Sequence, residues 1–190
     1  MTAAGETDEA LMGRYARGDA SAFESLYRRH ELRVWRYLQR SVRNRAAADE
    51  LMQEVWFAVA REALRYEPTA RFTTWLFTIA HNRLIDAIRA SRPHVSFDAV
   101  GYEADGVLQH LTAPPAASPL AAAVAGEQSA AILQAVEQLP AEQRAAFLLQ
   151  MEGELEVQDI AAITGSTFET AKSRLRYARV KLRELLKEHA

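Results

Sequence analysis

The segment DIAAITGSTFETA, residues 159–171, decides the fold of this 190-residue chain. A small residue, Ala161, is followed four positions later by Gly165. The alanine lets two helices approach closely, and glycine readily takes the left-handed backbone conformation that a tight turn needs. Ser166 or Thr167 can cap the helix that begins after the turn. The spacing therefore predicts a helix-turn-helix.

The residues after the turn predict one long helix with two stripes. The apolar stripe consists of Ala171, Leu175, Ala178, Leu182 and Leu185, and the basic stripe of Lys172, Arg176, Arg179, Arg183 and Lys187. In a helix-turn-helix, the start of the second helix contacts base edges in the major groove, while basic residues later in the helix hold phosphates. A charge run is more often a solvated helix face, but the turn directly upstream favours DNA binding. The predicted DNA contacts are Phe168, Glu169, Thr170, Lys172, Ser173, Arg174, Arg176 and Arg179.

Charge is segregated along the chain, although the formal net charge is only -2. Residues 28–45 contain seven arginines and one acid. Residues 167–190 contain seven basic and three acidic residues. Local basic stripes can bind phosphates while acidic segments elsewhere cancel their charge, so a net charge near zero does not exclude DNA binding.

The middle of the chain has the composition of a linker. Four of the 6 prolines and three of the 8 glycines lie within residues 93–126, which contain no lysine or arginine. This composition disfavours a packed core and predicts a flexible linker. On both sides apolar residues recur at helical spacing, without the alternation typical of strands. We therefore predict an all-α fold with two small helical domains, residues 1–92 and 127–190, the second being the helix-turn-helix.

Three apolar stripes predict three helices in the N-terminal domain. They comprise Phe23, Leu26, Tyr27, His30, Val34 and Leu38; Leu51, Val55 and Val59; and Phe72, Leu76, Ile79 and Arg83. The stretch 66–69 contains a proline and interrupts the chain before the third helix. In the C-terminal domain we predict helices over 131–139 and 157–164, with Pro140 in the first turn of the helix between them.

Several protein classes are disfavoured by the composition. Without cysteine, the chain has no disulfide framework and no cysteine zinc site. Glu6, Asp8 and Glu9 stand where an export signal would have basic residues and then an apolar core. Apolar runs fall far short of the roughly 20 residues that span a bilayer. We therefore expect a cytoplasmic protein that does not insert into a membrane.

An enzyme is the first alternative interpretation, suggested by Glu50 and Glu54 and by the spacing of His81 and Asp86. The 5 histidines are scattered, and no pair has the i, i+4 spacing of a helical zinc site. The sequence also lacks a glycine-rich loop that could cradle phosphates. We predict no catalytic residues, no metal site and no cofactor.

Four segments carry a family resemblance: ADELMQEVW at 48–56, FTTWLFTIAHNRLID at 72–86, LPAEQR at 139–144 and TAKSRL at 170–175. In this order they resemble the extracytoplasmic-function branch of the sigma-70 family, over nearly the whole chain. The resemblance implies an alternative sigma factor that binds bacterial core RNA polymerase and directs it to promoter DNA. It also implies an anti-sigma factor, often membrane-anchored, as a further partner. The second alternative, a free-standing helix-turn-helix regulator, explains the C-terminal half equally well but not the first two segments.

The resemblance assigns roles to particular residues. The core-polymerase-binding helix would act through Asp49, Gln53, Glu54 and Trp56. The loop 66–71 and the helix after it would recognise and melt the -10 element through Tyr66, Arg71, Trp75, Asn82 and Arg83, with Asn82 as the expected base contact. Tyr66, Trp75 and Phe77 could stack on bases, although aromatic residues in helices more often belong to the core. The helix-turn-helix would read the -35 element.

Two positions depart from the family pattern. Glu154 stands where the family usually has glycine, with Gly153 one place early. We therefore expect a differently shaped loop before the helix-turn-helix. Ala171 stands where a larger β-branched residue is common. Both departures make the promoter sequence harder to infer, but they leave the inferred function unchanged.

Overall fold

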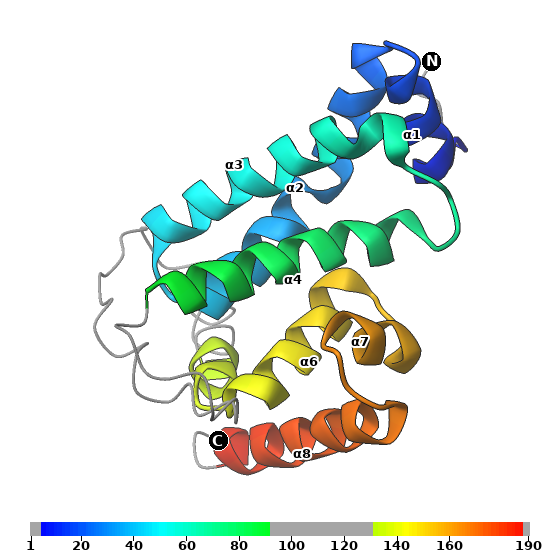
Figure 1. Ribbon diagram of the computed structural model, residues 1–190. Coiled ribbons are helices and arrows are strands. Elements are labelled where there is room, and N and C mark those ends of the chain that lie inside the picture. The colour runs from blue at the N-terminus through cyan, green and yellow to red at the C-terminus, as the bar shows by residue number, and fades with distance from the viewer. Residues whose placement is uncertain (1–4, 92–130, 188–190) are drawn as a thin grey trace.

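The computed structural model describes residues 5–91 and 131–187, and within these ranges every regular element is helical (Figure 1). The elements are α1 (Asp8–Ala16), α2 (Ala20–Val42), α3 (Arg45–Glu62), the 3-10 turn η1 (Ala63–Arg65) and α4 (Phe72–Ala90), then a helical segment over residues 131–137, and α6 (Ala141–Gly153), α7 (Val157–Ile163) and α8 (Phe168–Lys187). The predicted all-α fold is confirmed. The predicted linker, residues 93–126, lies outside the described residues.

The N-terminal helices begin at short polar residues that cap them. Thr7, Asp19 and Asn44 each accept a backbone N–H from the first turn of α1, α2 and α3 respectively. The apolar faces of α2, α3 and α4 then pack on one another to form a core. Within it, the rings of Tyr37 and Phe77 meet edge to face, with centroids 5.6 Å apart.

The connection between α7 and α8 has the predicted helix-turn-helix geometry. Gly165 adopts the left-handed conformation, with a φ of 61°. Thr167, not Ser166, caps α8, because its Oγ1 accepts the backbone N–H of Thr170 at 3.2 Å. The Ser166 hydroxyl instead lies 3.0 Å from that of Thr164. The predicted turn is therefore confirmed, and the choice between the two capping residues is resolved.

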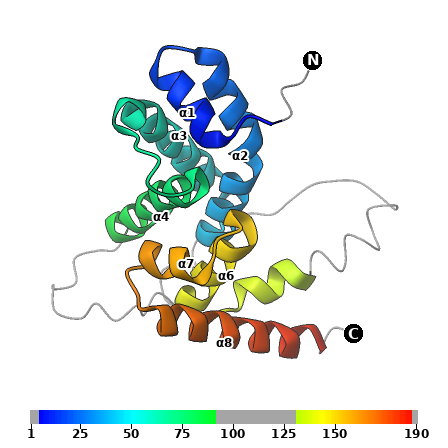
Figure 2. The ribbon, with the colours of Figure 1, turned by 90° about the vertical axis from the view of Figure 1, so that its right-hand side faces the viewer.

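The two halves of the molecule pack against each other, with α6 on α2 and α4, and α7 on α4 (Figures 1 and 2). Arg40 of α2 forms an ion pair with Glu152, whose side chain is only 8% exposed. The Nε of Arg33 donates to the backbone carbonyl of Glu152 at 2.7 Å, and Arg43 donates to that of Glu137. Part of the arginine-rich stretch on α2 therefore holds the two halves together.

Glu154, the residue that replaces the family's usual glycine, itself takes the left-handed conformation, with a φ of 52°. That conformation costs a non-glycine residue about 1–2 kcal/mol. The Glu154 carboxylate lies 2.7 Å from a terminal nitrogen of Arg33. The preceding Gly153 packs so tightly that an added Cβ would lie 2.8 Å from Leu155 Cγ and 3.4 Å from Phe77 Cδ2. The loop thus fits closely against the N-terminal half.

Candidate protein-docking and nucleic-acid surfaces

The candidate docking surface on α3 is a largely apolar groove with polar residues exposed on the same helix. Trp56 lines this groove and is only 5% exposed, with its ring centroid 5.7 Å from that of Phe23 and 4.9 Å from that of Tyr27. Gln53 and Glu54 are exposed beside it. The groove is lined by Phe23, Tyr27, Met52, Gln53, Trp56, Phe57 and Ala60. Trp56 therefore contributes mainly packing and shape, whereas the polar candidates contribute accessible groups.

The same surface includes a large apolar residue that the sequence analysis did not single out. Phe57 lines the groove and is 72% exposed. At the other end of α3, the exposed Asp49 accepts a hydrogen bond of 2.8 Å from Trp35 Nε1 and lies 3.9 Å from Arg45. An aromatic residue accessible on an otherwise polar helix face could have signalled this position. An apolar centre with a polar rim is typical of protein–protein interfaces.

The two aromatic candidates for the second surface pack together at the base of the loop 66–71. The Tyr66 ring meets Trp75 edge to face at 4.9 Å and Phe72 at 6.1 Å. Burial, with a smaller contribution from nearby carboxylates, raises the pKa of Tyr66 to about 12. Phe77 is fully buried against α2, so this orientation leaves it no surface for stacking on a base. Stacking by Tyr66 or Trp75 would require them to separate.

The polar candidates of this surface lie along α4. Asn82 and Arg71 are exposed and Arg83 is half-buried. Arg71, Trp75 and Asn82 follow one another at intervals of four and seven residues, so they share one helix face over about 16 Å. Behind Asn82, His81 is buried, and burial lowers its pKa to about 4. The ring of His81 is therefore neutral at neutral pH.

The basic surface lies on α8, where most of the predicted DNA contacts are accessible. The exposed ones are Phe168, Glu169, Thr170, Lys172, Arg176 and Arg179, and Ser173 is half-buried. Arg174 differs, because its side chain is 19% exposed and forms a 2.6 Å ion pair with Glu142 of α6. In this conformation Arg174 holds α8 on α6, and the other seven residues form the accessible surface.

Neighbouring groups organise the cations of α8. The Lys172 ammonium lies 3.8 Å from Glu169 and 5.9 Å from the Phe168 ring centroid. The Arg176 guanidinium lies over Tyr177, 4.8 Å from its ring centroid. Tyr177 is 52% exposed and was not predicted from the sequence. These weak surface contacts leave the cations available to phosphates and base edges.

Two searches confined to residues 5–91 and 131–187 were negative. No group of three or more His, Asp or Glu side chains there could hold a metal ion. No helix in the same ranges is long and apolar enough to cross a bilayer.

Comparisons with known proteins identify both halves of the chain. A family model described as Sigma-70 region 2 matches residues 26–93, and one described as Sigma-70, region 4 matches residues 129–182. RNA polymerase sigma factor CarQ from Myxococcus xanthus is 37% identical, over 93% of this chain and 96% of its own length. ECF RNA polymerase sigma factor RpoE from Cereibacter sphaeroides is 32% identical, over 87% of each chain.

Solved structures agree with the fold. The structure of CnrH in complex with the cytosolic domain of CnrY matches with a TM-score of 0.68 and 20% identity, over 97% of this chain and 100% of that one. The sigma factor RpoE from Bartonella quintana, in complex with the anti-sigma factor NepR, matches with a TM-score of 0.59 and 22% identity, over 87% of this chain and 96% of that one. With both regions matched in order, the chain belongs to the extracytoplasmic-function branch of the sigma-70 family, whose members are transcription initiation factors and not enzymes.

Proposed function

We propose that this chain is an alternative sigma factor that binds core RNA polymerase through α3 and contacts the two promoter elements through α4 and α8. The observation that carries the proposal is the presence of both sigma-70 regions, at 26–93 and 129–182, in one chain. We divide the chain into residues 1–92 for the polymerase and the -10 element, 93–126 as linker, and 127–190 for the -35 element. Since core polymerase is its partner, the site of action is the cytoplasm.

The groove on α3 is the proposed polymerase-docking surface. Trp56 and Phe57 line it with apolar surface and Gln53 with a polar group, and Asp49 and Glu54 are exposed on the same helix. Burial of an apolar centre inside a ring of hydrogen-bonding groups gives both affinity and orientation. We expect Phe57 to act with the four residues that the family resemblance suggests.

The face of α4 that contains Trp75 and Asn82, with Arg71 directly before the helix, is the proposed -10 surface, together with Tyr66 and Arg83. Extruding a base costs a few kcal/mol, which hydrogen bonds to the base and stacking must offset. The exposed Asn82 amide can both donate to and accept from a base edge. We expect Arg71 and Arg83 to hold the phosphates of the same strand.

The start of α8 is the proposed -35 surface. Phe168, Glu169, Thr170, Lys172 and Ser173 lie in its first two turns, where a recognition helix reaches base edges. Arg176 and Arg179 follow on the exposed side, and Arg174 contributes by fixing the angle between α8 and α6.

We further propose control by an anti-sigma factor, which can be anchored in the membrane. Support comes from RpoE of Bartonella quintana, which was solved in complex with the anti-sigma factor NepR and shares this fold. The α3 groove and its exposed Phe57 offer such a partner an accessible apolar surface. Covering that groove would exclude core polymerase.

Run-off transcription tests the proposal. The purified chain is added to bacterial core polymerase with fragmented genomic DNA of the source organism, and core alone is the control. We expect discrete new start sites that disappear when Asp49 and Gln53 are both changed to Ala, and that persist in Glu24→Ala, an exposed change elsewhere. Duplex binding by the chain alone, without polymerase binding or transcripts, would instead favour a free-standing regulator.

A further inference from the structure

The N-terminal helix α1 lies before the segment that matches Sigma-70 region 2, and it contains none of the residues proposed above for polymerase or promoter. It lies at the end of the molecule remote from α8 (Figures 1 and 2). Leu11 and Met12 bury it against the bundle, and it contacts η1, which leads into the loop 66–71. Helix α1 is therefore the neighbour of the proposed -10 loop.

Glu9 of α1 caps the helix that follows this loop. Its Oε1 accepts the backbone N–H of Phe72, the first residue of α4, at 2.7 Å. The residue before α4, Arg71, makes no side-chain cap, and the first turn of α4 contains no acidic residue. The free N–H groups at a helix N-terminus carry partial positive charge and are best satisfied by a carboxylate or another oxygen. Glu9 therefore caps α4 from a helix that is far away in the sequence but adjacent in the fold, where the residues at the start of α4 provide no side-chain cap.

The other end of the loop is held on the same side. The Tyr66 ring packs on Phe72 and Trp75, and the turn η1 directly before Tyr66 contacts α1. Burial, and after it the charges of Glu9 and Asp8, raise the pKa of Tyr66 to about 12. Between these two ends, residues 67–71 are all exposed. The loop is therefore an accessible segment whose two ends are fixed next to α1.

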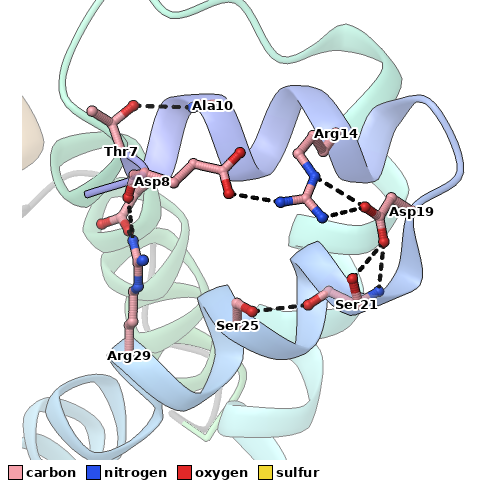
Figure 3. Close-up of polar contacts among 9 residues, drawn as sticks. Thr7, Asp8, Ala10, Arg14, Asp19, Ser21, Ser25 and Arg29 are labelled. Atoms are coloured by element: carbon pink, nitrogen blue, oxygen red, sulfur yellow. Dashed lines mark hydrogen bonds and ion pairs between the residues drawn. The ribbon is translucent and has the colours of Figure 1, made fainter. Parts of the chain in front are cut away.

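Helix α1 is itself fixed by a network of charged contacts (Figure 3). Asp8 pairs with Arg29 of α2 at 2.7 Å. Arg14 pairs with Asp19, through its Nε at 2.9 Å, and with Glu6 at 2.6 Å. Asp8 thus ties the start of α1 to the first half of α2, and Arg14 ties its last turn to the N-cap residue of α2, so Glu9 projects from a firmly held helix.

We propose that Glu9 is a positioning residue for -10 recognition: it holds the N-terminus of α4 and the loop 66–71 in the conformation that receives a promoter base. This inference rests on the proposed function. Without the cap, the first turn of α4 frays and the fraction of molecules with a competent loop falls. Loss of an N-cap interaction typically shifts such an equilibrium by about five-fold.

The test uses the full chain, core polymerase and a promoter mapped by the run-off experiment, with 2-aminopurine in the -10 element to report opening. A second promoter has one -10 base changed. We expect Glu9→Ala to reduce opening by up to about five-fold and to weaken the preference between the two promoters. Glu9→Gln keeps an oxygen that can accept from Phe72, so it should restore most of both. Core binding and -35 duplex binding should stay within about two-fold of wild type, as in the control Glu24→Gln.

Normal opening and normal -10 preference in Glu9→Ala would overturn the inference. So would a parallel loss of core binding, -35 binding and opening, which marks a residue that only stabilises the fold. If Glu9→Ala does not fold, Glu9→Asp is the deciding variant, because it keeps the charge but is one methylene too short to reach the backbone N–H of Phe72. The inference requires that Glu9→Asp loses the -10 preference while it still binds core polymerase. A wild-type chain without transcripts refutes the proposed function itself, whereas an active chain indifferent to Glu9 refutes this inference alone.

Discussion

Changing Glu152 to Gln should loosen the contact between the two halves of the molecule. The Glu152 side chain is 8% exposed, and its ion-pair partner Arg40 is 27% exposed. Removing one partner of a fully buried pair costs about 3–5 kcal/mol, because the remaining charge is left without compensation. Since water can still reach Arg40, we discount this to about 1–3 kcal/mol. The glutamine keeps the shape, and the backbone carbonyl at 152 still accepts from Arg33.

The assay is urea unfolding followed by circular dichroism, combined with hydrogen exchange at α2 and α6. A double-mutant cycle with Arg40→Met isolates the ion pair from the packing of the two side chains. The matched control is Glu24→Gln, which removes an exposed i, i+4 ion pair between Glu24 and Arg28 of α2, the helix that contains Arg40. It should cost less than about 0.5 kcal/mol. A coupling energy below about 0.5 kcal/mol between Glu152 and Arg40, with unchanged protection of α6, would refute the reasoning.

Three further outcomes follow from single residues. Glu154→Gly should be about 1 kcal/mol more stable to urea than Glu154→Ala, because only glycine takes the left-handed conformation without strain; equal stabilities would contradict this. Burial lowers the pKa of His81 to about 4, so the unfolded chain takes up the proton at higher pH than the folded one. The free energy of unfolding should therefore fall by about 1 kcal/mol per pH unit between about pH 6.5 and pH 4. His81→Gln should remove that contribution from the pH dependence of urea unfolding. Arg176→Ala should weaken -35 duplex binding about 10- to 100-fold with unchanged stability in a fluorescence titration, whereas Arg174→Ala should mainly lower stability by removing the pair with Glu142.

The sequence by itself determined the local features. The left-handed turn at Gly165 and the apolar stripes of α2, α3, α4 and α8 were predictable, because each depends on residues within one or two helical turns. The family motifs were likewise readable, since they are short and in a fixed order. The accessible candidates on α8 follow from the same periodicity, because residues opposite a buried stripe face solvent.

Only the tertiary structure decided which charged residues serve the fold. In the sequence, Arg40 belongs to a basic stretch and Arg174 is a predicted DNA contact, but each pairs with a glutamate of α6, Glu152 and Glu142 respectively, far away in the chain. Trp56 belongs to the core because Phe23 comes from another helix to cover it. Local periodicity carries no information about which distant side chain will reach such a group. The partner is set by how helices cross and where their ends meet, so the packing of the whole chain had to be known.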